Sequence, residues 1–279
     1  AAVAHNDRAT FDSLWAYYKA RRNGNGVMNW KYQGCTHNVT GQNGATDAEL
    51  DAAMALIQAE CKWQGYRADA TALVNAVRQH ETQDGSPAVL KPGDQYGGPG
   101  CVNPSYFPPG YYRVFARLVP ADAAFWNKLA NDTYTIINAA DNDQTGLVPD
   151  WTDTSGRPGG SSCAGEHAGR QGYGYDGART PWAVAIDYVW FNTPAAKTWL
   201  TKVANFANGI GFANIKDGYN LNGTPTAAGL YHNSTFAGAF ALASLAHSQE
   251  LSNSFHLGFA GVPAFNDDVE TLELDAADP

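Results

Sequence analysis

The chain has 279 residues, enough to bury one sizeable hydrophobic core and close to the length at which single cores stop growing, so we expect one domain. Its formal net charge is −9 and only 16% of its residues are charged, which argues against a nucleic-acid groove or an anionic membrane surface as partner. Hydrophobic residues make up 44% of the chain, and no apolar run approaches the roughly 18 residues that cross a bilayer, so we expect a globular protein without membrane segments.

Helical patterns follow one another along the chain, whereas the alternating patterns typical of strands are scarce. The clearest helix is predicted from Asp47 to about Gln64, with Thr46 and Glu49 in the spacing of a capping box at its start. Its apolar stripe consists of Leu50, Ala53, Met54, Ile57 and Cys61. The other predicted helices span Ala9–Arg21, Ala68–Gln83, Pro109–Leu118, Ala121–Ala139, Pro181–Phe191, Pro194–Asn208 and Ser234–Gln249. These patterns predict an all-α fold of stacked helical hairpins.

Three long loops separate these helices, and they are rich in glycine, proline, asparagine and aromatic residues. They cover Asn23–Ala45, Gln83–Pro108 and Gly146–Thr180. Binding and catalytic groups gather on loops that a rigid scaffold holds in place. We therefore expect the three loops to converge on one open cleft.

The end of the chain differs in composition from the rest. Residues 267–279 contain six acids and no basic residue. Such a run is typical of a solvated acidic segment. The sequence therefore predicts a helical domain over residues 1–266, followed by an acidic tail over residues 267–279.

The four cysteines are Cys35, Cys61, Cys101 and Cys163, and no two of them form a C-x-x-C pair. We therefore expect no metal site, and no cofactor motif is present either. All except Cys61 lie in segments of the kind where an extracellular protein places disulfides, and four cysteines allow three pairings. Cys61 lies on an apolar stripe, so we expect it to be a buried thiol.

Two acidic residues occupy positions where a carboxylate could do chemistry. Asp47 lies in the first turn of its predicted helix, where the helix dipole favours an ionised carboxylate. Asp176 lies among aromatic residues, three positions before Arg179 and just before the helix predicted at Pro181, so it could act as a general base. The alternatives are an ordinary first-turn acid for Asp47 and a surface ion pair for Asp176.

Glycosidases usually need two carboxyl groups, and their sites add aromatic rings that stack on sugars. Aromatic residues are frequent in and beside the three loops. As substrate-binding residues we predict Trp30, Tyr111, Trp151, Tyr175 and Trp182.

The segment Ala45–Asp51, with the apolar run that follows it, closely resembles the signature of glycoside hydrolase family 8, with Glu49 where aspartate is common. Further blocks resemble this family and occur in its order along the chain. They are Gly26–Trp30, Leu90–Gly93, Asn103–Phe107, Gly146–Trp151, Tyr175–Trp182 and Asp217–Tyr219.

The resemblance implies an (α/α)6 barrel that cleaves β-1,4-linked polysaccharide with inversion. It implies that Asp176 is the general base, that Asp47 stabilises positive charge at the cleaved sugar, that Tyr106 helps to hold the attacking water and that Arg179 orients Asp176. The expected enzyme is a secreted or periplasmic bacterial endo-β-1,4-glucanase on cellulose-like or mixed-linkage glucan, with chitosan and then xylan as alternative substrates.

The glutamate that serves as general acid in this family lies in a stretch that ends just before the segment that residues 1–4 resemble. We therefore expect a barrel that is incomplete at both termini, with the acid supplied by a preceding segment or a second chain. Glu166 is the one substitute within this chain that we consider. The alternative from another class is a catalytically silent carbohydrate-binding remnant.

Overall fold

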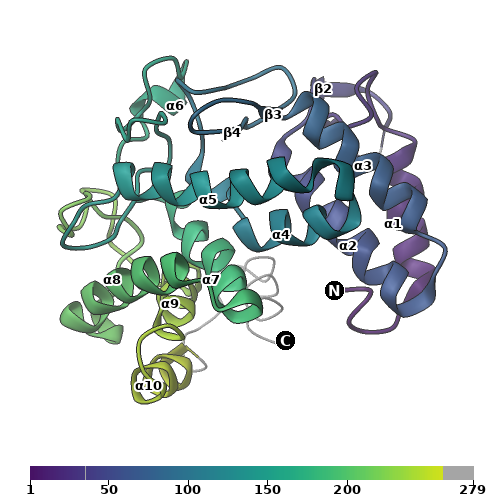
Figure 1. Ribbon diagram of the computed structural model, residues 1–279. Coiled ribbons are helices and arrows are strands. Elements are labelled where there is room, and N and C mark those ends of the chain that lie inside the picture. Colours follow the sequence, from purple (N-terminus) through teal and green to yellow (C-terminus); the bar gives the residue numbers. More distant parts are fainter. Residues whose placement is uncertain (35, 260–279) are drawn as a thin grey trace.

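The computed structural model describes residues 1–34 and 36–259, and Figure 1 shows them as an arc of helices. The helices are α1 (Arg8–Lys19), α2 (Thr46–Trp63), α3 (Arg67–His80), α4 (Pro109–Leu118), α5 (Ala123–Ala140), α6 (Glu166–Gly169), α7 (Thr180–Phe191), α8 (Pro194–Ile210), α9 (Ser234–Ser244) and α10 (Gln249–Phe259). Four 3-10 turns are η1 (Pro104–Tyr106), η2 (Pro120–Asp122), η3 (Gly177–Arg179) and η4 (Phe212–Asn214). Two antiparallel pairs join β1 (Lys31–Tyr32) to β2 (Val39–Gly41) and β3 (Thr82–Gln83) to β4 (Val89–Leu90). The predicted all-α class is confirmed.

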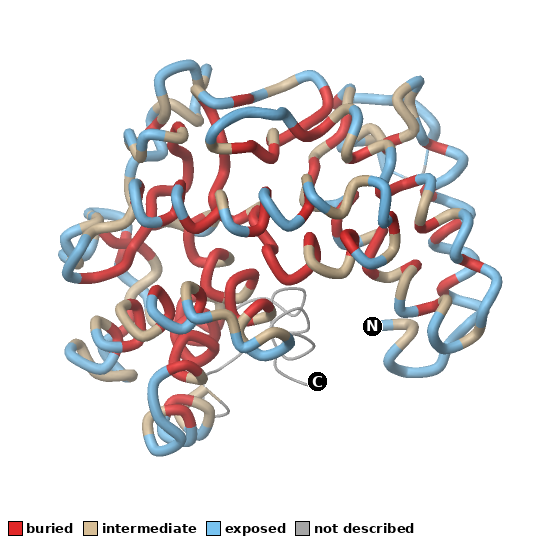
Figure 2. Tube along the Cα trace, in the orientation of Figure 1, coloured by how far each residue is buried: buried red, intermediate tan, exposed pale blue. Residues whose placement is uncertain are grey.

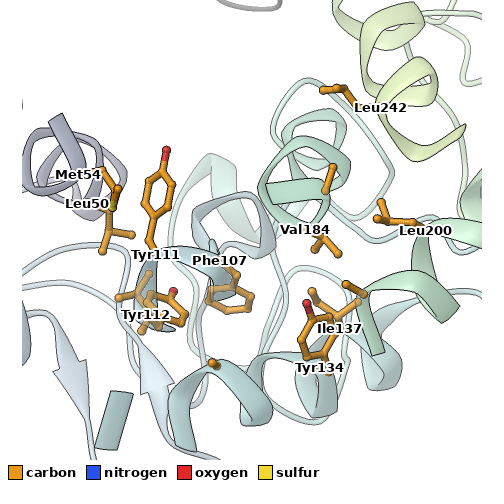
Figure 3. Close-up of a cluster of buried hydrophobic side chains, with 14 of the residues drawn as sticks. Leu50, Met54, Phe107, Tyr111, Tyr112, Tyr134, Ile137, Val184, Leu200 and Leu242 are labelled. Carbon is orange, nitrogen blue, oxygen red and sulfur yellow. The ribbon is translucent and has the colours of Figure 1, made fainter. Parts of the chain in front are cut away.

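Helices that are close in sequence pack against each other, as stacked hairpins require. α2 packs on α3, α4 on both α5 and α7, and α9 on α7, α8 and α10. Their apolar faces form one continuous core. Figure 2 shows the buried residues of these helices in red. Figure 3 shows part of this core, with Leu50 and Met54 of α2, Tyr134 of α5 and Val184 of α7.

The predicted capping box at the start of α2 is wrong. Ala45 is the N-cap, and the Thr46 hydroxyl instead donates to the carbonyl oxygen of Lys91 at 2.7 Å. Glu49 is fully buried and accepts hydrogen bonds from the Tyr18 hydroxyl and the Met28 amide. Both side chains therefore tie α2 to neighbouring segments and do not form a capping box.

The cysteines test two predictions made from the sequence, one about disulfides and one about Cys61. Cys101 and Cys163 form a disulfide that joins two of the long loops, one of the arrangements that the sequence left open. Cys61 is a free, exposed thiol, so the prediction of a buried one is wrong. The buried face of α2 runs through Leu56 and Ala59. Leu50, Ala53 and Met54 of the predicted stripe are buried, so the stripe is correct in the first part of α2 and differs only toward its end. Cys35 lies outside the described residues.

The helix predicted over Ser234–Gln249 ends at Ser244, and the separate helix α10 was not predicted. The Ser248 hydroxyl accepts the Leu251 amide at 3.2 Å, which is the hydrogen bond of a helix N-cap. Ser248 was therefore the signal for a new helix. The acidic tail over residues 267–279 falls outside the described part of the chain.

Between α1 and α2 lies a mostly apolar cavity of about 280 Å³, lined in part by residues 1–3. Within the described ranges, no helix has the length and hydropathy that a membrane span requires.

Candidate active site

Asp47 and Asp176, 129 positions apart in sequence, lie at the N-terminal ends of two helices and share one cation. Asp47 is the second residue of α2, and Asp176 directly precedes η3, which leads into α7. The Arg179 guanidinium donates to Asp47 at 3.1 Å and to Asp176 at 2.7 Å. The two carboxylates are therefore within reach of a single side chain, as an active site shared between them requires.

The Asp176 carboxylate has further partners on its second oxygen. The Trp151 indole N–H donates to Oδ2 at 3.1 Å, and the Arg170 guanidinium lies 3.4 Å from the same atom. Three side chains therefore hold Asp176, namely Arg179 of η3 and, from the loop before it, Trp151 and Arg170. Sequence reasoning found Arg179 and missed Arg170, whose approach depends on how its loop folds.

Tyr106 completes the group of predicted catalytic residues. It ends η1, three residues before α4, and its ring lies 5.4 Å from the Arg179 guanidinium carbon. Its ring also meets the Trp151 ring edge-on, with the centroids 6.4 Å apart. Burial raises the pKa of the Tyr106 hydroxyl above its usual value, and the Asp47 charge adds to this. Tyr106 is therefore a neutral hydroxyl that can hold a water molecule.

The environment of Asp47 differs from the sequence expectation. Burial raises the pKa of its carboxyl above the usual value, and Arg179 opposes this by favouring the charged form. The helix dipole alone predicts a lowered pKa. Asp51, one turn further along α2, was not singled out from the sequence. Desolvation raises the pKa of Asp51 to about 7, and the Asp47 charge adds to this increase. The residue nevertheless keeps contact with solvent.

The predicted sugar-stacking residues divide into three groups. Trp30 and Tyr175 are 57% and 49% exposed, so each can present a ring to a sugar. Trp182 on α7 is half-buried against the core. Trp151 is only 4% exposed, because His167 stacks on its ring with the centroids 4.0 Å apart.

Tyr111 is also buried. Its hydroxyl donates to Asp51, and its ring stacks on Trp190 of α7 with the centroids 6.0 Å apart. Tyr111 and Trp151 are only 8% and 4% exposed and each stacks on a neighbouring ring, so within this chain neither presents a ring to solvent. Trp151 contributes to the site through its N–H group.

The three long loops meet one another, as predicted. Gly44 of the first loop donates its amide to Asp94 of the second at 2.7 Å. The second and third loops are joined by the Cys101–Cys163 disulfide and by pairing of Val102 with Thr152. These contacts hold together the segments that carry Asp47, Tyr106 and Asp176.

Glu166, considered as a substitute acid, is the first residue of α6. Its side chain is 70% exposed and accepts a hydrogen bond from Arg170 at 3.0 Å. This pairing suits an ionised carboxylate better than a proton donor. A search of residues 1–34 and 36–259 finds no cluster of three or more His, Cys, Asp and Glu side chains that could hold a metal ion.

The arrangement suits the hydrolysis of a glycosidic bond. A carboxylate fixed by two arginines and an indole can take a proton from a water molecule, and a second carboxylate lies on the other side of Arg179. Positive charge that develops on a sugar ring near this pair would be stabilised by it.

The sequence matches the profile of the family described as glycosyl hydrolases family 8 over residues 1–260. Endoglucanase 2 of Ruminiclostridium josui is 39% identical over 254 residues, which are 88% of this chain and 52% of that protein. Endoglucanase A of Acetivibrio thermocellus is 38% identical over 255 residues, with 88% of this chain and 51% of that protein covered. The chain therefore belongs to glycosyl hydrolase family 8. It spans about half the length of these curated relatives.

Solved structures agree with this assignment. A β-1,3-1,4-glucanase from Paenibacillus sp. X4 superposes with a TM-score of 0.85 at 28% identity, over 95% of this chain and 74% of that one. A family 8 enzyme of Teredinibacter turnerae, solved with xylobiose, gives a TM-score of 0.83 at 20% identity over 99% and 77% of the two chains. The latter shows the shared fold alone. The predicted (α/α)6 barrel fold is confirmed.

Proposed function

We propose that this chain carries the water-activating side of the active site of an inverting endoglucanase that cleaves β-1,4-linked glucan. Asp176 acts as the general base, Asp47 stabilises charge on the cleaved sugar, Tyr106 holds the water and Arg179 fixes both carboxylates. The contact of one guanidinium with both carboxylates carries this proposal. Trp30 and Tyr175 serve as stacking surfaces for the glucan chain.

For the substrate we favour glucan, including mixed-linkage glucan. Relatives of this chain are named endoglucanases, and one structural neighbour is named a β-1,3-1,4-glucanase. Chitosan is the second candidate, because partly exposed carboxylates such as Asp51 and Asp217 could bind its ammonium groups. Xylan is the third.

We further propose that the general acid is contributed by polypeptide outside residues 1–279, either a preceding segment or a second chain. The exposed, arginine-paired Glu166 supports this choice, because it suits the role poorly. The protein would act in a secreted or periplasmic setting, which its Cys101–Cys163 disulfide supports.

The decisive variant is Asp176→Asn in the full-length protein. We expect turnover of soluble β-glucan to fall by about 10²–10⁴-fold, because a missing base affects the transition state more than the ground state. Binding of cello-oligosaccharides, measured by calorimetry, should change little. Asp84→Asn, at an exposed carboxylate that pairs with Arg78, is the matched control. Normal hydrolysis by Asp176→Asn would remove Asp176 from the mechanism.

The same assay on residues 1–279 alone separates an enzyme from a binding remnant. We expect weak oligosaccharide binding and very slow release of reducing sugar, from glucan and chitosan alike. Rapid hydrolysis would show that a carboxylate within this chain protonates the leaving group, and Glu166 would be the first to be replaced.

A further inference from the structure

Asp150 is a buried carboxylate next to the site with no role in the reaction outlined above. It lies in the loop between α5 and α6, directly before Trp151, and is only 7% exposed. Its Oδ1 accepts the amide N–H of Gly174 at 2.7 Å and that of Gly177 at 2.8 Å. One carboxylate oxygen thus binds the backbone on both sides of the Tyr175–Asp176 pair.

The two glycines allow this close approach. A Cβ atom on Gly174 would lie 2.5 Å from the Asp150 Oδ2, and one on Gly177 would lie 3.2 Å from Oδ1 and 3.0 Å from the Val148 carbonyl oxygen. Neither glycine has a positive φ angle. Glycine is therefore needed at these positions because of the nearby carboxylate and backbone and not because of backbone strain.

Neighbouring groups hold the same turn. The Asp150 amide donates to the Gly172 carbonyl oxygen at 2.8 Å, and the Trp151 indole donates to the Asp176 carboxylate itself. Two consecutive residues therefore fix the turn. Asp150 binds the backbone of the turn through its carboxylate and its amide, and Trp151 binds the Asp176 side chain through its indole N–H.

The surroundings of Asp150 shift its pKa into a range in which its protonation can be followed. Burial raises the pKa of its carboxyl to about 6, and the Asp176 charge adds to this increase. The N–H groups of Gly177 and Gly174 and the charge of Arg170 act in the opposite direction. Protonation of Asp150 weakens hydrogen bonds that its charged oxygen accepts.

We propose that Asp150 is a positioning residue that fixes the Gly174–Gly177 turn and so aims the Asp176 carboxylate at the attacking water. The inference rests on the proposed role of Asp176 as the base. The inference adds that the backbone amides of Gly174 and Gly177, which flank the base, must be held by Asp150 for the base to be aimed.

The first test is independent of activity. In ¹H–¹⁵N NMR spectra recorded across pH, the Gly174 and Gly177 amide protons should lie downfield and titrate together with a midpoint near pH 6. Asp150→Asn should abolish the titration and keep both amides dispersed. Asp153→Asn is the matched control, because Asp153 is also buried and accepts two backbone amides, those of Ser155 and Arg157, outside this turn. Amides that do not respond to Asp150→Asn would overturn the proposal.

The second test is kinetic and uses the full-length protein. Asp150→Ala should lower kcat about 10²-fold with little change in KM, because a misplaced base loses turnover and not substrate binding. Asp150→Asn, which can still accept both hydrogen bonds, should restore most of kcat. A rise in KM together with the fall in kcat would overturn the positioning role of Asp150. An Asp150→Asn variant as slow as Asp150→Ala despite intact amide signals would overturn it as well. Absence of hydrolysis in the unaltered protein would instead refute the proposed function, and the NMR result would still report on Asp150.

Discussion

Arg179 contacts both acidic side chains of the site, so the distance between them depends on it. Without a cation the two carboxylates would repel each other and turn toward solvent. Its guanidinium fits this task because its planar nitrogens can donate to two carboxylates at once, which a lysine ammonium does less well. The ion pairs of Arg179 with Asp47 and Asp176 are partly exposed, so their contribution to folding stability is modest.

Replacing Arg179 with Gln should therefore affect turnover far more than stability. We expect kcat of the full-length protein to fall about 10²-fold from misplacement of Asp176, and the melting temperature to change little. Arg179→Lys should recover part of the loss. Arg157→Gln, an exposed arginine of the preceding loop, is the control. A large fall in melting temperature with preserved kcat would assign Arg179 a purely structural role.

At this scale the sequence was informative about residues that the motifs single out. Asp47, Asp176, Tyr106 and Arg179 were found from motifs, and the structure places them together. Trp151 and Tyr111 were predicted to stack on sugars, and in this chain each stacks on a neighbouring ring. An aromatic residue in a loop can present its face or its polar edge, and only the packing of neighbours such as His167 decides which.

Among the elements, the loop between α5 and α7 has the largest effect on the site. The disulfide anchors Cys163 to Cys101, and the short α6 that follows carries His167 against Trp151. Arg170 comes just after α6 and reaches Asp176. A covalent bond between the second and third loops thus restrains the segment that carries Arg170, a partner of Asp176.

Removal of the disulfide should loosen this loop. We expect Cys101→Ser/Cys163→Ser to lower the free energy of unfolding by about 2–4 kcal/mol, because the bond closes a loop of 62 residues in the unfolded chain. The kcat of the full-length protein should also fall, since Arg170 loses its fixed position. Cys61→Ser, at the exposed free thiol, is the control and should change neither quantity. Treatment with dithiothreitol should reproduce the double variant, and unchanged stability would contradict the expected restraint.

Helix prediction succeeded where a single apolar face coincides with strong end signals. α4 occurs over the predicted residues Pro109–Leu118, because proline begins it and its apolar residues share one face. α9 is buried all round, so its periodicity carried no information about its end. The capping box failed for a related reason. Thr46 and Glu49 bind partners from other segments, and such tertiary contacts leave no trace in local spacing.

On the scale of the whole molecule, several acidic side chains have a raised pKa. Glu49 of α2 and Glu81, just after α3, both approach Gly44, where a Cβ would be 3.4 Å and 2.5 Å from their oxygens. Burial raises the pKa of Glu49 to about 8, and burial with the Glu49 charge raises that of Glu81 well above its usual value. Burial also raises the pKa of Asp51 and Asp150.

These shifts predict a protein that is more stable in mild acid than in alkali. The raised pKa of Glu49 contributes stability that is complete below the unfolded value, about 4.5 for Glu, and that is lost as the pH rises through the folded value near 8. Glu49→Gln should make the decline of the unfolding free energy between these limits less steep by up to about 1.4 kcal/mol per pH unit. Urea denaturation at several pH values measures this. A slope in Glu49→Gln equal to that of the unaltered protein would refute the assignment.

The hydrogen bond between Arg179 and Asp47 joins residues 132 positions apart. Helical hairpins such as α2–α3 and α4–α5 need only local contacts and can form early, whereas this link waits until most of the chain has been ordered. During synthesis, Asp47 leaves the ribosome long before its partner exists. The nascent N-terminal hairpins therefore carry an unpaired acid at a helix end, and the site becomes complete only when α7 docks. Loss of order in α2 or in the segment that leads into α7 would abolish the site while the other helices remain.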